Sequence, residues 1–188
     1  KIKKNHSNID FIVHALAFSD KEELKGRYIE TSRNNFLKTL DISTFSFTRI
    51  AKVSKNLINS DGGSLLTLTY LGAVRTTPNY NVMGVAKAAL ETSVKYLSMD
   101  LGTNNIRVNA ISAGPMKTLA GAAISGARHV FRYSEKVAPL KKNPNLIQVG
   151  NAALYLLSDL SSGVSGVIHH VDGGLHSTGV PVQKDIEF

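Results

Sequence analysis

Residues 64–70 read Ser-Leu-Leu-Thr-Leu-Thr-Tyr, a short stretch that we interpret as a strand. A helical pattern follows at 80–101, preceded by Pro78 and stopped near Gly102. Residues 106–112, Ile-Arg-Val-Asn-Ala-Ile-Ser, then read as a further strand. The connection is long enough for a right-handed crossover, so we expect the two strands to be parallel neighbours in one sheet.

The same alternation extends to both sides of this stretch. Upstream, residues 9–16 are a short apolar run, which predicts a strand buried on both faces, and 34–59 have helical spacing. Downstream we expect a loosely packed helix, a second helix and a fourth strand, at 118–133, 146–157 and 166–171. Alternating strands and helices predict an α/β fold, a Rossmann-like doubly wound parallel sheet with helices on both faces, in one domain over residues 1–188.

The composition excludes several classes of protein. The chain has no Cys, which excludes disulfides, thiolate metal sites and a Cys nucleophile. No apolar run approaches the roughly 18 residues of a membrane-spanning helix. The opening Lys1-Ile2-Lys3-Lys4 lacks the apolar segment of a signal peptide. We therefore expect a soluble cytoplasmic protein without a membrane partner.

The formal net charge of +8 favours anionic partners. Nucleic acid is the least favoured of them, because no run of five basic residues occurs and aromatic residues do not interleave with the charges. One basic cluster stands out, opposed only by Glu135: Arg128, His129, Arg132, Lys136, Lys141 and Lys142. It is either a solvated helix face or a surface for an acidic protein or a phosphate-bearing ligand.

In parallel α/β sheets the ligand lies outside the carboxyl ends of the strands. Tyr70 ends the strand at 64–70, where it either lines a site or packs in the core. Tyr80 and Lys87 are seven residues apart, close to two helical turns, so both side chains point the same way. Such an ammonium can favour the tyrosinate and bind sugar hydroxyls. Most Tyr and Lys residues at this spacing are nevertheless a ring packed in the core and an amine in solvent, without a shared function.

The remaining candidates carry weaker signals. His14 lies inside the first expected strand and reads as a core histidine with satisfied hydrogen bonds. His169 and His170 are consecutive in the last strand, so only one can face a given layer. No three-ligand metal spacing is visible, and we predict no metal. Ser64 and Ser112 have no His or Asp partner for a nucleophilic triad.

Four segments carry a resemblance to one family: 66–73 (Leu-Thr-Leu-Thr-Tyr-Leu-Gly-Ala), 78–88 (Pro-Asn-Tyr-Asn-Val-Met-Gly-Val-Ala-Lys-Ala), 108–115 (Val-Asn-Ala-Ile-Ser-Ala-Gly-Pro) and 171–174 (Val-Asp-Gly-Gly). They resemble the bacterial enoyl-acyl-carrier-protein reductases of type II fatty acid synthesis, a divergent branch of the short-chain dehydrogenase/reductase superfamily. The most specific feature is the six residues between Tyr80 and Lys87. Ordinary members of the superfamily have three, and Gly84 excludes that arrangement here.

The resemblance implies NAD(P)H-dependent reduction of the trans-2 double bond of enoyl-acyl-carrier-protein thioesters, with NADH favoured over NADPH. Tyr70, Tyr80 and Lys87 are the implied catalytic residues: Tyr80 would hydrogen-bond the thioester oxygen as charge builds on it, and Lys87 would bind the nicotinamide ribose. The implied cofactor-binding residues are Ala15, Leu16, Ala17, Leu68, Lys87, Ala113, Gly114, Pro115, Met116 and Thr118. The implied substrate-binding residues are Ala17, Tyr70, Tyr80, Met83 and Met116.

The resemblance also implies partners. The helix from Thr118 onward would be a mobile lid over the substrate, and the basic cluster would meet the acidic carrier protein. A homotetramer is implied as well, with Phe45, Phe47 and Ile50 as candidate interface residues.

The sequence departs from the family pattern at its start. The family's fold begins with strands and helices that precede Ile9 and carry a Gly-rich phosphate loop, and no G-x-G-x-x-G occurs here. We expect a sequence that lacks this N-terminal part, leaves its first strand as a sheet edge, and is inactive by itself. The alternatives are another short-chain dehydrogenase/reductase acting on a different enone or ketone, and a non-catalytic remnant.

Overall fold

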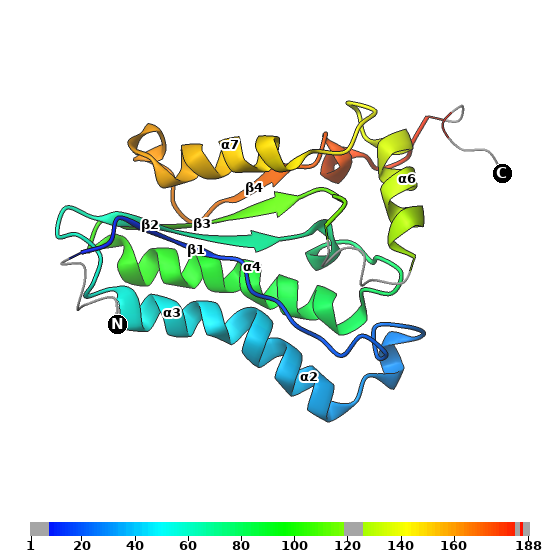
Figure 1. Ribbon diagram of the computed structural model, residues 1–188, viewed down its shortest axis with the longest axis horizontal. Coiled ribbons are helices and arrows are strands. Elements are labelled where there is room, and N and C mark those ends of the chain that lie inside the picture. The colour runs from blue at the N-terminus through cyan, green and yellow to red at the C-terminus, as the bar shows by residue number, and fades with distance from the viewer. Residues whose placement is uncertain (1–7, 119–125, 183–184, 186–188) are drawn as a thin grey trace.

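The computed structural model describes residues 8–118, 126–182 and 185, and it contains a four-stranded parallel sheet (Figure 1). The strands lie in chain order: β1 (Phe11–His14), β2 (Gly63–Thr69), β3 (Ile106–Ala113) and β4 (Ile168–Val171). The register pairs Thr69 with Ser112 and Ala113 with Val171. The carboxyl ends of β2, β3 and β4 therefore meet at one edge of the sheet, as the sequence predicted.

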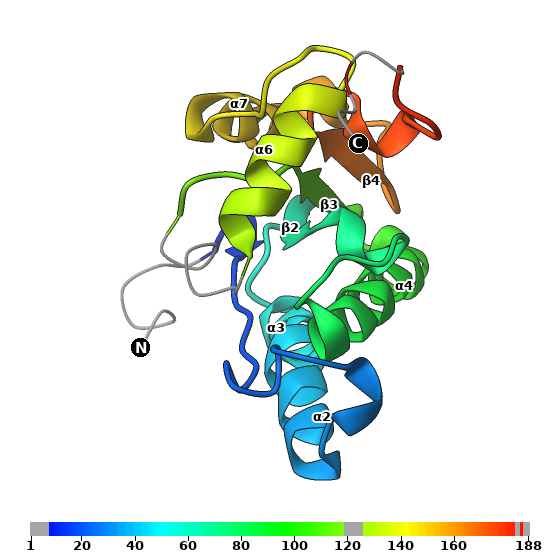
Figure 2. The same ribbon diagram turned by 90° about the vertical axis from the view of Figure 1, so that its right-hand side faces the viewer.

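Helices cover both faces of the sheet, which confirms the doubly wound architecture (Figures 1 and 2). Helices α2 (Arg33–Leu40), α3 (Ser46–Ser54) and α4 (Asn81–Gly102) lie on one side, and α7 (Leu146–Leu157) lies on the other. Helix α6 (Ala127–Val137) stands across the carboxyl edge. Short 3-10 turns occupy Tyr28–Glu30, Leu71–Ala73, Asp159–Ser161 and Leu175–Ser177.

Two apolar cores follow from the alternation of side chains along the strands. Leu65 points into the core beneath α3 and α4, where it packs with Phe47 and Leu90. Leu66, the next residue, points into the core beneath α7 and packs with Leu156. All five side chains are completely buried, so the helices are held to the sheet by apolar burial.

The first strand is buried on one face only, which corrects the prediction from its apolar run. Phe11 and Val13 are 52% and 47% exposed, whereas His14 is 2% exposed. The cause is position: β1 is an edge strand, and among the described residues no helix covers the face that carries Phe11 and Val13. The expectation that this strand forms a sheet edge is confirmed.

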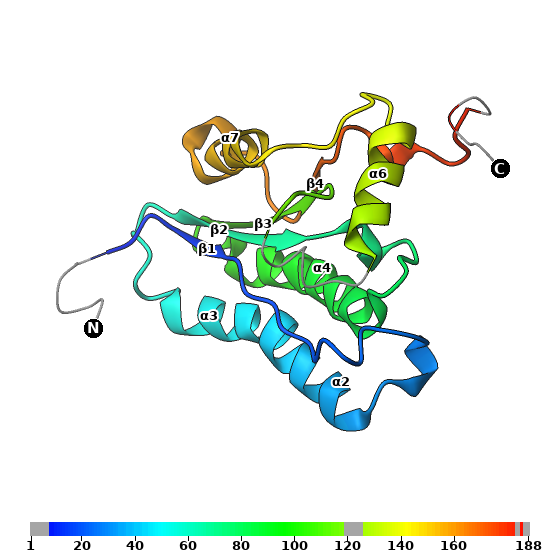
Figure 3. The same ribbon diagram turned by 45° about the vertical axis from the view of Figure 1, so that its right-hand side comes forward.

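The helical pattern at 34–59 is one nearly continuous helix with an interruption (Figure 3). A π-helical turn at Asp41–Phe45 separates α2 from α3. Ser43 and Thr44 in this turn are buried: Ser43 Oγ donates to the Phe18 carbonyl, and Thr44 Oγ1 donates to the Ala86 carbonyl in α4. The π turn therefore fastens the helix to the segment after β1 and to α4.

The interface prediction for this helix was wrong for one residue. Phe47 is fully buried in the core, whereas Phe45 is 56% exposed and Ile50 is partly buried. None of the helices that the structure describes is both long enough and apolar enough to span a membrane.

Candidate active site

The candidate site is built where β2 ends and α4 begins. Thr69 is the last residue of β2, Tyr70 follows it, and the 3-10 turn Leu71–Ala73 leads away from the sheet. Tyr80 is the residue before the first turn of α4. The chain therefore leaves the sheet at Tyr70 and enters α4 at Tyr80. The loop between them folds back, so that the two tyrosines meet.

Two asparagines fix the backbone on either side of Tyr80. Asn79 and Asn81 both have positive φ, 59° and 41°, in the left-handed region that Asn tolerates better than most residues. The side-chain amide of Asn81 donates to the carbonyls of Leu24 and Gly26 at 3.2 and 3.3 Å. The two asparagines of the Asn-Tyr-Asn motif thus supply the backbone conformation that turns the Tyr80 side chain inward at the start of α4.

Glycines 72 and 84 make room for the Tyr80 ring and its loop. A Cβ on Gly72 would lie 2.5 Å from Tyr80 Cδ1, and one on Gly84 would lie 2.8 Å from the Gly72 carbonyl oxygen. Both distances are shorter than any tolerated contact. The turn, the Tyr80 ring and α4 can therefore approach this closely only because both positions lack a side chain.

The rings of Tyr70 and Tyr80 form a pair. Their centroids are 5.2 Å apart and their planes are inclined by 72°, an edge-to-face arrangement. Tyr80 is 7% exposed and packs in a cluster with Leu24, Met83 and Tyr70. The two tyrosines and Met83, three of the predicted substrate-binding residues, are thus brought together by the fold.

Both phenols are held in the protonated form at neutral pH. Burial raises the pKa of Tyr70 above its ordinary value. Burial, the Tyr70 phenol and the Glu91 carboxylate raise the pKa of Tyr80 much further. The expectation that Lys87 favours the tyrosinate is not met, because desolvation of the ring dominates and the two charges that act on it, those of Tyr70 and Glu91, also favour the protonated phenol. Each phenol is a hydrogen-bond donor rather than a base.

Lys87 is buried on the same helix two turns later. Its side chain is 7% exposed, and its ammonium Nζ donates to the Leu68 carbonyl at 2.7 Å. Burial lowers the pKa of Lys87 to about 8, and the Glu91 carboxylate opposes this shift. The alternative interpretation of the Tyr80–Lys87 spacing, in which the Lys87 amine lies in solvent, is therefore excluded. Lys87 is tied to the carboxyl end of β2, next to the tyrosine pair.

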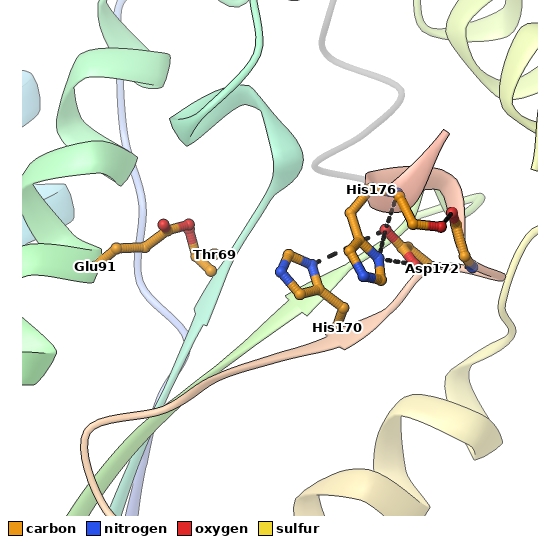
Figure 4. A network of polar contacts seen from close by, with 7 residues as sticks. Thr69, Glu91, His170, Asp172 and His176 are labelled. Carbon is orange, nitrogen blue, oxygen red and sulfur yellow. Dashed lines mark hydrogen bonds and ion pairs between the residues drawn. The ribbon is translucent and has the colours of Figure 1, made fainter. Parts of the chain in front are cut away.

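Sequence reasoning missed Glu91, which lies one turn beyond Lys87. Thr69 Oγ1 donates to Glu91 Oε1 at 2.7 Å, which joins α4 to the end of β2 (Figure 4). Burial raises the pKa of Glu91, and Thr69, Lys95 and Lys87 oppose that shift. The spacing of four residues from Lys87 was the available signal, because it places both side chains on one face of α4.

The predicted cofactor-binding segments follow β1 and β3 at the same edge. Ala15, Leu16 and Ala17 are exposed after β1, and Leu16 is 54% exposed. After β3, Gly114 is buried so tightly that an added Cβ would lie 2.9 Å from Asp172 Cα and Pro144 Cδ. Ala113, Pro115, Met116 and Thr118 are partly buried around it. These residues border the carboxyl edge, as a ligand-binding role requires.

The predicted lid lies partly outside the described residues, which exclude 119–125. Helix α6 begins at Ala127 rather than at Thr118, and its inward face carries Ser134 and Val137. The basic cluster lies on α6 and the loop that follows it, and its six members are all exposed.

Three of the histidines have defined environments. The ring nitrogens of His14 are hydrogen-bonded to Thr67 Oγ1 at 3.0 Å and Ser46 Oγ at 2.8 Å, which confirms the prediction of a satisfied core histidine. His170 and His176 converge on Asp172 at the end of β4 (Figure 4). This group could not be predicted from residue spacing, because the backbone reversal at Gly173 and Gly174, both with positive φ, brings His176 back beside the strand.

Comparisons with known proteins point to one family. A family model described as "Enoyl-(Acyl carrier protein) reductase" matches residues 1–176. The chain is 59% identical, over 95% of its length, to enoyl-[acyl-carrier-protein] reductase [NADH] 1 of Rhizobium meliloti, and it spans 65% of that protein. It is 51% identical, over 94% of its length, to the enoyl-[acyl-carrier-protein] reductase [NADPH] FabI of Staphylococcus aureus, of which it covers 69%.

A solved structure shares the fold closely. The enoyl-(acyl-carrier-protein) reductase of Anaplasma phagocytophilum, crystallised in complex with NAD, superposes with a TM-score of 0.92 at 53% identity. The match covers 96% of this chain and 69% of the crystallised one.

Proposed function

The chain belongs to the enoyl-(acyl carrier protein) reductase family, and we propose that it carries the catalytic centre of an NAD(P)H-dependent reductase of enoyl-acyl-carrier-protein thioesters in fatty acid synthesis. The observation that carries the proposal is the convergence of Tyr70, Tyr80 and Lys87. The tyrosine rings are 5.2 Å apart, and the Lys87 ammonium is anchored at the end of the same strand.

The chain offers groups that fit a nicotinamide cofactor. The Lys87 ammonium has three N–H bonds and donates one to the Leu68 carbonyl, so it can donate to ribose hydroxyls from a fixed position. Ala113, Gly114, Pro115, Met116 and Thr118 supply a wall at the end of β3, and Ala15, Leu16 and Ala17 a second one after β1. A bound reduced nicotinamide supplies a hydride. NADH is the favoured form, as in the name of the Rhizobium meliloti relative, although the Staphylococcus aureus relative is named for NADPH.

The reaction transfers one hydride and one proton, so two electrons in all. Hydride addition to the β-carbon of the enoyl thioester moves the carbon–carbon double bond to between the α-carbon and the carbonyl carbon, and the carbonyl π pair moves onto the thioester oxygen. A proton then reaches the α-carbon, and the electron pair returns from the oxygen. The negative charge on the oxygen is the feature that a protein must stabilise in the transition state.

In this proposal Tyr80 donates a hydrogen bond to that oxygen. Its raised pKa keeps the phenol protonated throughout the neutral range, and its burial removes water that would compete for the same oxygen. Tyr70 packs edge-on against Tyr80 and orients its ring, and Met83 and Met116 give the acyl chain an apolar surface. Tyr70, Tyr80 and Lys87 are thus catalytic residues in this proposal.

We assign the basic cluster on α6 to the carrier protein. Arg128, Arg132 and Lys136 are exposed on one helix that stands over the carboxyl edge, where a bound thioester would enter. An acidic carrier protein would be attracted to this surface from a distance. We also propose homotetramer assembly through the outer helices, whose exposed apolar side chains include Phe45, Val53, Tyr96 and Met99.

The test is an assay of the complete protein with NADH and a trans-2-enoyl thioester, followed by the loss of reduced nicotinamide. We expect turnover with the enoyl thioester and none with a 3-oxoacyl thioester. Turnover of the 3-oxoacyl thioester alone would instead support another short-chain dehydrogenase/reductase activity. No turnover of either, in a folded protein that binds NADH, would favour a non-catalytic role.

The variant Tyr80→Phe isolates the phenol. It keeps the ring that fills the pocket beside Gly72, so we expect an unchanged fold and a loss of kcat of about 10²–10³-fold, the usual effect of removing one oxyanion donor. Tyr96→Phe is the matched control, because Tyr96 lies on the same helix and is 69% exposed. Full activity in Tyr80→Phe would refute the assigned role.

A further inference from the structure

We propose that His170, Asp172 and His176 form a binding site for a divalent transition-metal ion, with Zn²⁺ as the ion that suits these ligands best. Two imidazoles and one carboxylate are ligands that Zn²⁺ and its neighbours favour. The group lies at the end of β4, apart from Tyr80 and Lys87, and the proposal is independent of the reductase activity.

The three side chains converge on one small volume (Figure 4). One ligand atom from each residue can be chosen so that all three lie within 4.8 Å of one another. His176 Nδ1 is 3.0 Å from Asp172 Oδ1, and His170 Nδ1 is 4.0 Å from Asp172 Oδ2. Zn²⁺ binds nitrogen and carboxylate oxygen at about 2.0–2.2 Å in a tetrahedral site, which puts its ligand atoms about 3.4 Å apart, so a closure of about 1–1.5 Å of the widest pair would bring all three within bonding distance of the ion.

The carboxylate is already fixed in the position that a ligand needs. Asp172 is 3% exposed, its Oδ1 accepts from the Gly174 amide at 3.0 Å, and its Oδ2 accepts from the His176 amide at 2.8 Å. Hydrogen bonds to a coordinating carboxylate fix its orientation toward the ion. Both oxygens also lie within 3.1 Å of His176 Nδ1, so the lone pairs that face this nitrogen are the ones that an ion would take when it replaces the proton on the nitrogen.

His170 supplies the observation that points to a missing ligand. Within the described part of the chain, its Nδ1 is buried and has no hydrogen-bond partner. Buried polar atoms without a partner are rare and require an explanation, such as an ion. The nitrogen lies 4.0 Å from Asp172 Oδ2, too far for a hydrogen bond, so a modest approach of the two atoms would let both bind one ion between them.

The two imidazoles stand face to face. Their centroids are 3.9 Å apart and their planes differ by 12°, so both Nδ1 atoms can be presented from the same side of the stack. Side-chain exposures of 29% and 37% leave both rings room to rotate. A cavity of about 260 Å³ adjoins the group, and it gives water access to the coordination positions that three protein ligands leave open.

Lys142 lines the same cavity and is the cation that opposes the site. Its ammonium weakens the binding of any cation there. The choice of ion comes from the two imidazoles, because nitrogen ligands suit Zn²⁺, whereas Mg²⁺ and Ca²⁺ need several oxygen ligands. In the occupied state the ion would join β4 to the turn at Leu175–Ser177, and the free energy of unfolding would rise with the logarithm of the ion concentration once that exceeds the dissociation constant.

The test is calorimetric titration of the tag-free, chelator-treated complete protein with ZnCl₂. We expect one ion per chain and a dissociation constant that rises at least tenfold in His170→Ala and in His176→Ala. The matched control is His169→Ala, which removes the preceding histidine of the same strand, whose ring tilts against Tyr155 instead. Lys142→Ala should tighten binding.

A second readout does not depend on affinity. Zn²⁺ should raise the Tm of the wild type and of His169→Ala and leave that of His176→Gln unchanged, with circular dichroism confirming that each variant is folded. The proposal is overturned if the wild type shows no saturable binding, or if His176→Ala and His176→Gln bind Zn²⁺ as the wild type does.

Discussion

The ring of Tyr80 lies edge-on against the ring of Tyr70, although nine residues of chain and a reversal of direction separate them. The contact joins the end of β2 to the beginning of α4, so a displacement of either element moves both phenols. Four measurements test how this arrangement is held and used.

Gly72→Ala should displace Tyr80. The new Cβ would lie 2.5 Å from the Tyr80 ring, which must move, and we expect a loss of about 1–3 kcal/mol in the free energy of unfolding together with most of the reductase activity. Urea denaturation and the enoyl thioester assay measure the two effects. Gly150→Ala in α7 is the control: no atom lies within 4 Å of the added Cβ, and stability should be equal or higher by up to about 1 kcal/mol.

Lys87 should give the free energy of unfolding a distinct pH dependence. Its pKa is about 8 when folded and 10.5 when unfolded, so between these values the unfolded chain binds more protons than the folded one. The shifted pKa of Lys87 therefore lowers the free energy of unfolding most below about pH 8. This cost disappears as the pH rises from about 8 to 10.5, so the free energy of unfolding rises by up to about 3 kcal/mol over that range. Denaturation of the wild type and of Lys87→Met across this range tests it, since only the wild type should show the rise.

Glu91 should set the alkaline limit of activity. Its charge opposes the burial that lowers the pKa of Lys87, so Glu91→Gln should lower that pKa further. If the Lys87 ammonium holds the cofactor, the loss of kcat/KM at high pH will then begin at lower pH than in the wild type. Thr69→Val separates the charge from the hydrogen bond, because it removes the 2.7 Å contact and keeps the carboxylate. This role would be contradicted if kcat/KM fell at the same alkaline pH in Glu91→Gln as in the wild type.

The basic face of α6 should distinguish carrier-protein substrates from small thioesters. Arg128→Glu combined with Arg132→Glu should raise KM at least tenfold for an enoyl-carrier-protein thioester and leave KM for an enoyl-coenzyme A thioester within about twofold. The wild-type KM for the carrier-protein substrate should also rise with salt, because screening weakens attraction between exposed charges. An equal change for both substrates would place the effect in the catalytic site instead.

The order of the strands and helices could be predicted from the sequence because it rests on local patterns. Leu65 and Leu66 show why: neighbouring apolar residues in a strand must fill separate cores, so two helical layers are required. Helix α7 begins and ends where expected, at Leu146 and Leu157, since Asn145 and Gln148 form a capping box that is readable in the sequence.

The environment of each site residue was beyond prediction from spacing. The spacing of Tyr80 and Lys87 indicates a shared helix face, but not that desolvation keeps Tyr80 protonated and lowers the pKa of Lys87. His170, Asp172 and His176 escaped notice for a related reason. Their convergence depends on two consecutive glycines with positive φ after β4, and this loop path has no periodic signature.

The π turn between α2 and α3 has a consequence for the tolerance of this protein to insertion and deletion. An α-helix advances by 100° per residue, so removing one residue from 41–45 would restore regular winding but rotate all of α2 relative to α3. Ser43 and Thr44 would then leave Phe18 and Ala86, and the buried Asn35 and Thr39 of α2 would turn away from Ser19. The extra residue therefore sets the rotation of α2 about its axis relative to α3. We expect the length of this helix to be fixed in homologous chains even where its surface residues vary.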